Sequence, residues 1–139
     1  FDLYDDEWSL APKALKALGS DDDVGFRPNL LIMDRLEISP KYRGQNIGLR
    51  AIRWLMMQMS TGCGAIALRA FPLQFESKVK GDPLELSKLG LDTFKGDFKR
   101  AERKLRRHYS KLGFKVIPGT DIMVANPELV TPSLGADDD

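Results

Sequence analysis

The sequence predicts an α/β fold of the α+β kind, with a mixed central sheet flanked by helices. Two apolar, strand-like runs over residues 30–39 and 65–71 are joined by a stretch whose apolar residues have helical spacing. A strongly amphipathic stretch over 94–112 and two short strand-like runs follow. The composition, 42% hydrophobic and 29% charged over 139 residues, is that of an ordinary globular domain.

The first half of this pattern predicts a strand, a short loop, a helix and a second strand. Residues 30–39 predict a strand because polar and apolar side chains alternate, and Pro40 ends it. A helix is expected from about 46 to 60, since apolar residues recur every three or four positions and glycines follow. Residues 65–71 predict a buried strand that runs parallel to the first.

The second half predicts an insertion, a helix and a hairpin. Residues 72–93 are punctuated by prolines and glycines and predict an irregular insertion. Over 94–112 the apolar residues share one helical face, and the bases fall mostly on the other. Gly113 ends this helix, and residues 114–117 and 122–125 predict a hairpin.

The charge pattern divides the chain into three predicted parts. Residues 1–29 predict an acidic N-terminal segment and linker, with seven acids and three bases, net −4. Residues 30–126 predict the folded domain. They contain two basic blocks, +4 over 41–53 from four bases and +7 over 94–115 from nine bases and two acids. Residues 127–139 end in three aspartates and predict an acidic disordered tail.

Cysteine and histidine are too scarce to build a site. Cys63 is the single cysteine and His108 the single histidine, so neither a disulfide within the chain nor a metal site is expected. Cys63 predicts a buried small residue and His108 a solvated helix residue. No apolar run approaches the roughly 20 residues that a membrane span needs, so no membrane partner is expected. These features predict a cytoplasmic protein.

The segment that carries chemistry is the junction at residues 36–50, where a strand runs through a short loop into a helix. A helix start presents unpaired backbone N–H groups and the positive end of the helix dipole, and such a site binds phosphate. Gly44 allows a tight turn and Asn46 tolerates a left-handed backbone. Arg43 and Arg50 add positive charge. A plain strand–loop–helix connection is the competing interpretation.

Two known phosphate loops do not fit this junction. The Walker-type loop requires Gly-Lys-Ser or Gly-Lys-Thr, and the dinucleotide loop requires three glycines and a later acid. A third pattern fits. The run Leu36-Glu37-Ile38-Ser39-Pro40-Lys41-Tyr42-Arg43-Gly44-Gln45-Asn46-Ile47-Gly48 resembles motif A of the GNAT superfamily, the acetyl-CoA-dependent N-acetyltransferases.

Motif A is written Gln/Arg-x-x-Gly-x-Gly/Ala. Arg43 matches its first position and Gly48 its last, while Asn46 stands where the motif has its central glycine. Downstream, the run from Tyr109 to Phe114 resembles motif B, in which a helix ends in Tyr-x-x-x-Gly-Phe. The resemblance covers roughly residues 30–125 and implies a GNAT-like domain whose N-terminal part is reduced or missing.

The resemblance implies an N-acetyltransferase that moves an acetyl group from acetyl-CoA to a primary amine. The pantetheine amides would pair with the backbone of Leu36, Glu37 and Ile38. The pyrophosphate would lie on Arg43, Gly44, Gln45, Asn46, Ile47, Gly48 and Leu49. Tyr109 matches the tyrosine that protonates the departing CoA thiolate. Glu102 stands where many members have a cofactor-contacting asparagine, so that contact is not carried over.

The base that deprotonates the amine is not fixed by the sequence. Glu37 is the nearest candidate on the strand pattern, with Asp34, Glu76 or a water chain as alternatives. For each carboxylate, an exposed or structurally paired side chain is the competing interpretation.

Two further functions stay open, a non-catalytic CoA-binding or protein-interaction module of the same fold and a nucleic-acid-binding domain that uses the basic helix 94–112. For that helix the sequence favours a solvated face over nucleic acid, because aromatic interleaving and a paired helix are lacking. A third interpretation places Arg103 and Arg107 at the 3′-phosphate of CoA. The acceptor amine is not identified, and a homodimer stays open.

Overall fold

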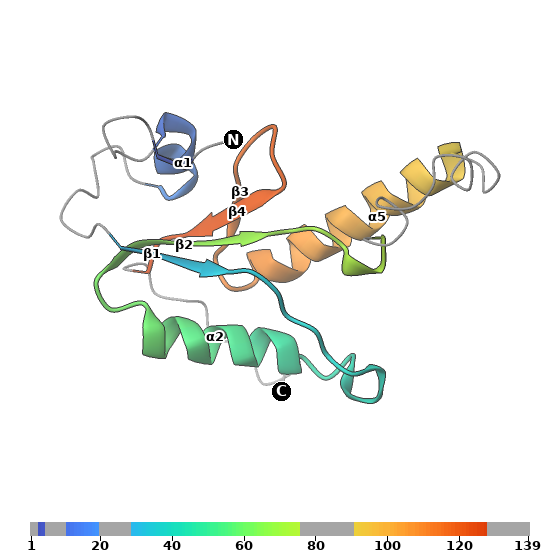
Figure 1. The fold of residues 1–139 in the computed structure, drawn as a ribbon, viewed down its shortest axis with the longest axis horizontal. Coiled ribbons are helices and arrows are strands. Elements are labelled where there is room, and N and C mark those ends of the chain that lie inside the picture. The colour runs from blue at the N-terminus through green and yellow to red at the C-terminus, as the bar shows by residue number, and fades with distance from the viewer. Residues whose placement is uncertain (1–2, 5–10, 20–28, 76–90, 128–139) are drawn as a thin grey trace.

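The computed structural model describes residues 3–4, 11–19, 29–75 and 91–127. In chain order its elements are α1 (Pro12–Ala17), β1 (Asn29–Met33), α2 (Ile47–Met59), β2 (Cys63–Arg69), α5 (Leu91–Ser110), β3 (Lys115–Val116) and β4 (Ile122–Ala125). Short 3-10 turns lie at Pro40–Tyr42 and Leu73–Phe75. The strands form one mixed sheet in the order β1-β2-β4-β3, flanked by helices (Figure 1). The expected mixed α/β class is confirmed.

The strand directions place the carboxyl ends of three strands on the same side of the sheet. β1 and β2 run parallel, as the strand–helix–strand pattern predicts, and their register aligns Leu30 with Ala65 and Met33 with Leu68. β4 is antiparallel to both β2 and β3, which confirms the expected hairpin. The carboxyl ends of β1, β2 and β3 therefore share one edge of the sheet with the β3–β4 turn. We call it the carboxyl edge.

Side chains of β2 alternate between two cores, one on each face of the sheet. On one face Ile66 and Leu68 join residues from α2 and from the turn after α5. The buried members contributed by those elements are Leu49, Ile52, Met56, Leu112 and Phe114. Each large aliphatic side chain buried in this way contributes about 1.5–3 kcal/mol.

On the other face, Ala65 and Ala67 lie under α1. Ala14 and Leu18 come from α1 and its C-cap, and they are only 0% and 2% exposed. Part of the N-terminal segment 1–29 therefore packs against the sheet. α1 begins at Pro12, where the missing N–H of proline sacrifices no helical hydrogen bond.

The first strand is shorter than expected. The alternation over 30–39 predicts one strand, but β1 ends at Met33 and the chain continues to Ser39 without strand pairing. Leu36 and Ile38 stay half-buried while Glu37 is exposed, so the alternation continues in an extended segment that has left the ladder. The physical reason is packing, because Leu36 and Ile38 contact the first turn of α2 instead of continuing beside β2.

Other boundaries shift by two or three residues. β2 begins at Cys63 and ends at Arg69, before the expected end at 71, although the N–H of Ala70 still donates to the carbonyl of Asp121 at 2.7 Å. α5 begins at Leu91, three residues before the expected start, and its N-terminal half extends beyond the strands (Figure 1). The expected linker at 20–25 and most of the expected insertion and tail, including Glu76, lie outside the described residues.

Candidate functional site

The parallel strands β1 and β2 separate at the carboxyl edge. Their pairing ends at Met33 and Leu68, whereas β2 continues one residue further and pairs Arg69 with Ile122 of β4. Residues 34–39 carry the chain away from β2 toward the loop before α2. In open α/β sheets, ligands bind beyond the carboxyl ends of the strands, so this separation is the first element of the candidate site.

The loop between β1 and α2 contains two residues in the left-handed region of backbone space. Gly44 has φ 78° and Asn46, the N-cap of α2, has φ 56°. Glycine adopts this region without strain, and asparagine is one of the few other residues that visits it routinely. Both residues therefore have the turn-forming backbone conformation that the sequence predicts for this loop. Asn46 adopts a conformation that glycine adopts without strain.

The start of α2 is electropositive. The N–H groups of Ile47, Gly48 and Leu49 lack partners within the helix, since the first intrahelical bond here runs from Arg50 N to Asn46 O at 3.0 Å. The first turn of α2 holds no acidic residue, and the side chain of Arg50 is exposed. Backbone donors, the helix dipole and this guanidinium together favour an anion at this position.

Gly48 allows α2 to approach the extended segment closely. A Cβ at this position would lie 3.3 Å from Cδ2 of Leu36 and 3.6 Å from Cγ1 of Ile38. By contrast, a Cβ built on Gly44 would meet no atom within 4 Å. Gly48 therefore allows α2 to pack closely against the extended segment, whereas Gly44 allows the backbone to turn with a positive φ.

Arg43 joins the loop to the extended segment that follows β1. Its Nε donates a hydrogen bond to the carbonyl of Ile38 at 2.8 Å. This bond closes the turn through Pro40–Tyr42 and fixes the position of α2 relative to the segment that leaves β1. One of the backbone acceptors expected to meet pantetheine, the Ile38 carbonyl, thus already has an intramolecular donor.

Of the three carboxylates proposed as bases, the two that the structure describes, Asp34 and Glu37, are exposed. Glu37 is paired with Arg35, whose Nη2 lies 2.6 Å and whose Nε lies 2.7 Å from Oε1. Asp34 is exposed at the point where β1 ends. The pairing of Glu37 matches the competing interpretation of a structurally paired side chain, and Glu76 lies outside the described residues.

The register of the sheet places the start of β3 close to the point where β1 and β2 separate. Ile32 pairs with Ala67, Ala67 with Val124, and Val124 with Lys115, the first residue of β3. β3 therefore begins one residue from the Met33–Leu68 pair at which β1 and β2 separate. Tyr109, in the last turn of α5, packs against the same buried cluster as Leu49 of α2. Tyr109 thus lies on the α2 face of the sheet.

Tyr109 is held by aromatic neighbours and is half-buried. Its ring lies edge-on to His108 at 5.6 Å and to Phe114 at 6.4 Å between centroids. Burial raises the pKa of the Tyr109 phenol above its ordinary value of 10.0, because the phenolate would lose solvation. The phenol is therefore a neutral proton donor throughout the physiological pH range.

The two scarce residue types have ordinary environments. His108 is half-buried, and desolvation, Lys111 and Lys104 lower its pKa below 6.5, so the imidazole is neutral at pH 7. Cys63 is free and buried at the start of β2, with its Sγ 3.8 Å from the carbonyl of Met59. This position agrees with the prediction of a buried small residue.

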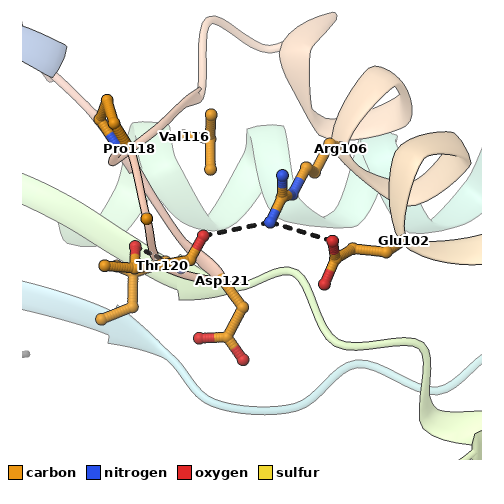
Figure 2. A pocket seen from close by; sticks show the side chains of 8 residues that line it. Glu102, Arg106, Val116, Pro118, Thr120 and Asp121 are labelled. Atoms are coloured by element: carbon orange, nitrogen blue, oxygen red, sulfur yellow. Dashed lines mark hydrogen bonds and ion pairs between the residues drawn. The ribbon is translucent and has the colours of Figure 1, made fainter. Parts of the chain in front are cut away.

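A cavity of about 560 Å³ lies between α5 and the β3–β4 turn (Figure 2). Its lining combines Glu102 and Arg106 of α5 with Thr120 and Asp121 of the turn. Nη2 of Arg106 donates to the carbonyl of Thr120 at 3.1 Å and lies 3.1 Å from Oε1 of Glu102. Figure 2 shows the Arg106 side chain reaching from α5 toward the turn to make these two contacts.

The other polar groups of this cavity also serve intramolecular bonds. The Thr120 hydroxyl donates to the carbonyl of Ile117 and accepts from the N–H of Ile122, while Asp121 pairs with Arg69 of β2. This network holds the hairpin against α5 and β2. Sequence reasoning missed it. The spacing of Glu102 and Arg106 is the usual i, i+4 pairing signal, but nothing local links Arg69 to Asp121, which lie 52 residues apart.

Comparison of the chain with protein-family models, with curated proteins and with solved structures found no match. Within the described residues, no group of three or more histidine, cysteine, aspartate or glutamate side chains is placed to hold a metal ion. The described helices include none that is long and apolar enough to cross a membrane.

Proposed function

We propose that this domain binds acetyl-CoA at the carboxyl edge and transfers its acetyl group to a primary amine. The observation that carries the proposal is the backbone of the loop before α2. Gly44 and Asn46 are both left-handed there, directly before a helix start without acids, in the connection that follows the point where β1 leaves β2. The motif resemblance of residues 36–48 and 109–114 supports the same function.

Two parts of the ligand, the pyrophosphate and the pantetheine arm, have corresponding groups in the chain. The pyrophosphate would accept hydrogen bonds from the N–H groups of the first turn of α2, with Arg50 adding charge. Pantetheine would lie along the segment 34–38, whose backbone has left the sheet and can pair with amides. The Ile38 carbonyl is held by Arg43, so Leu36 and Glu37 are the more available backbone partners.

The transfer step requires one bond to form and one to break. The amine nitrogen attacks the thioester carbonyl, the C–N bond forms, and the C–S bond breaks to release the CoA thiolate. Tyr109 is proposed to protonate that thiolate, a role for which a neutral phenol is required. The proton of the attacking amine leaves to solvent or to a carboxylate near the end of β1, for which Asp34 and Glu37 are the described candidates.

Thiol release measured over a panel of primary amines tests this function. Acetyl-CoA with an accepted amine should release thiol in proportion to the enzyme, and Tyr109→Phe should lower kcat by about 10²-fold or more. Ligand binding without thiol release from any amine would assign the non-catalytic CoA-binding alternative instead. Equal rates with and without the protein would reject catalysis.

A further inference from the structure

One face of α5 and of the turn after it carries a dense row of exposed cations. Over residues 95–111 the exposed bases are Lys95, Lys99, Arg100, Arg103, Lys104, Arg107 and Lys111. Asp97 is the one exposed acid among these described positions, and it lies 3.5 Å from Arg100. The other acid, Glu102, is turned away toward Arg106. The face therefore has a large net positive charge.

Most of these cations form no ion pair with another residue that the structure describes. Among the described residues, no ion pair is formed by Lys95, Lys99, Arg103, Lys104 or Arg107. Like charges on neighbouring helical turns repel one another, at a cost of a few tenths of a kcal/mol per pair. A polyanion that bound along the helix would remove that repulsion.

The spacing of the row suits a regular chain of phosphates. Lys95, Lys99 and Arg103 recur every four residues, which places them about 6 Å apart along the helix at a rise of 1.5 Å per residue. Each strand of a nucleic-acid duplex presents one phosphate per about 3.4 Å of its axis. The three cations are therefore spaced, along the helix axis, about as far apart as every second phosphate of one strand is along the duplex axis.

The buried face of α5 argues against a membrane surface as the partner. Phe98 packs against Phe71 and Phe75, with ring centroids 5.5 and 5.6 Å apart, and Leu105 and Tyr109 pack against the core. An amphipathic helix binds lipid by inserting its apolar face, and the described residues of that face, Phe98, Leu105 and Tyr109, already pack inside the domain. The cationic face can therefore offer electrostatic attraction alone.

We propose that the exposed face of α5 binds the phosphate backbone of a nucleic-acid duplex, of DNA or of RNA, without reading its sequence. The exposed described residues of α5 include no aromatic side chain on which unpaired bases could stack, so a duplex is favoured over a single strand. The N-terminal half of α5 extends beyond the strands, which leaves it accessible to a rod-shaped partner (Figure 1). The loop before α2 takes no part in this surface.

Fluorescence anisotropy with labelled 20-base-pair duplexes of DNA and of RNA tests the proposal. Affinity should fall with salt, with a slope of log K against log[salt] between about −3 and −4.5, as expected for up to five neutralised phosphates. Unrelated duplex sequences should compete equally. Binding that is absent at 50 mM salt, or a slope near zero, would overturn the proposal, as would binding confined to anionic lipid vesicles.

A pair of matched variants locates the surface. Lys95→Gln/Lys99→Gln removes two cations from the exposed face of α5 and should reduce the slope by about 2, since each lost phosphate contact reduces it by about 1. Lys13→Gln/Lys16→Gln removes two exposed cations from α1, on the opposite face of the sheet, and should leave the slope unchanged. An equal loss in both variants would show that only net charge matters and would overturn the assignment to α5. Circular dichroism of each variant confirms that its helices are intact.

Discussion

Nε of Arg43 donates a hydrogen bond to the carbonyl of Ile38 at 2.8 Å, and this contact joins the loop to the segment that leaves the sheet. It fixes where the first turn of α2 lies relative to the end of β1. Because the proposed pyrophosphate and pantetheine positions lie on opposite sides of this contact, the geometry of the whole site depends on it.

The substitution Arg43→Lys tests whether Arg43 acts through its hydrogen bond to Ile38 or through its positive charge. Lysine keeps the positive charge but has no planar Nε–H donor, so the loop should lose its attachment to Ile38. We expect the Kd for acetyl-CoA to rise about 10-fold, equivalent to about 1.4 kcal/mol, in calorimetric titration. Arg50→Lys, at an exposed position with no such bond in the described structure, is the control and should change Kd less than about 3-fold. Equal effects of the two substitutions would show that Arg43 acts through charge alone.

The two helical glycines should respond differently to alanine. Gly96 lies in α5, and a Cβ added there would meet no atom within 4 Å, so Gly96→Ala should gain about 0.5–1 kcal/mol in the free energy of unfolding. Gly48→Ala gains the same helix propensity but brings a Cβ to 3.3 Å from Leu36, which must shift. Its net gain should be smaller, and Gly48→Val should destabilise the domain. Urea denaturation of the three variants measures these differences, and identical gains for both alanines would contradict the close contact.

His108 predicts a pH dependence of stability. Its folded-state pKa is lowered below 6.5 by burial and by Lys111 and Lys104, so the unfolded chain binds the proton more readily. The free energy of unfolding should therefore fall as pH drops through and below 6.5, and His108→Gln should lessen that fall. Because His108 is the single histidine in the sequence, its imidazole signal in proton NMR gives the folded pKa directly. A midpoint at or above 6.5 would contradict the prediction.

The raised pKa of Tyr109 predicts how turnover and the free energy of unfolding change at high pH. Its raised pKa keeps the phenol protonated past pH 10.0, so turnover should not fall through ionisation of this residue between pH 7 and 9. The unfolded chain ionises first above pH 10.0, so the free energy of unfolding should decrease there, and Tyr109→Phe should weaken that decrease. Because the chain has three tyrosines, the Tyr109 signal is the part of the ultraviolet difference spectrum that Tyr109→Phe removes, and a midpoint below pH 10.0 for that part would contradict this account.

Local signals in the sequence predict much of the fold. Helical spacing over 47–59 and the glycine pair after it predict α2, and the turn around Gly119 predicts the hairpin, because these elements depend on nearby residues. The end of β1 at Met33 could not be predicted in this way. Beyond Met33 the backbone no longer pairs with β2 while Leu36 and Ile38 lie close to Gly48, and the alternation of side chains is the same with and without that pairing.

The candidate site also contains some features that the sequence predicts and others that it does not. The left-handed conformation of Asn46 follows from residue type and position. The sequence predicts the pairing of Glu37 with Arg35 only as a general alternative, because residues two positions apart share one face of any extended segment whether or not their side chains pair. The pair of Arg69 and Asp121 joins segments 52 residues apart, and no local pattern predicts it.

Titration of acetyl-CoA into variants at Asn46 by calorimetry tests the central claim most directly. The wild-type domain should bind one equivalent of acetyl-CoA. Asn46→Gly should preserve the affinity because glycine accepts φ 56° without strain, while Asn46→Val should raise Kd at least 10-fold because a β-branched residue there is strained by about 1–3 kcal/mol. Absence of heat from the wild-type domain at millimolar acetyl-CoA, or equal affinity for all three proteins, would contradict a ligand site at the start of α2.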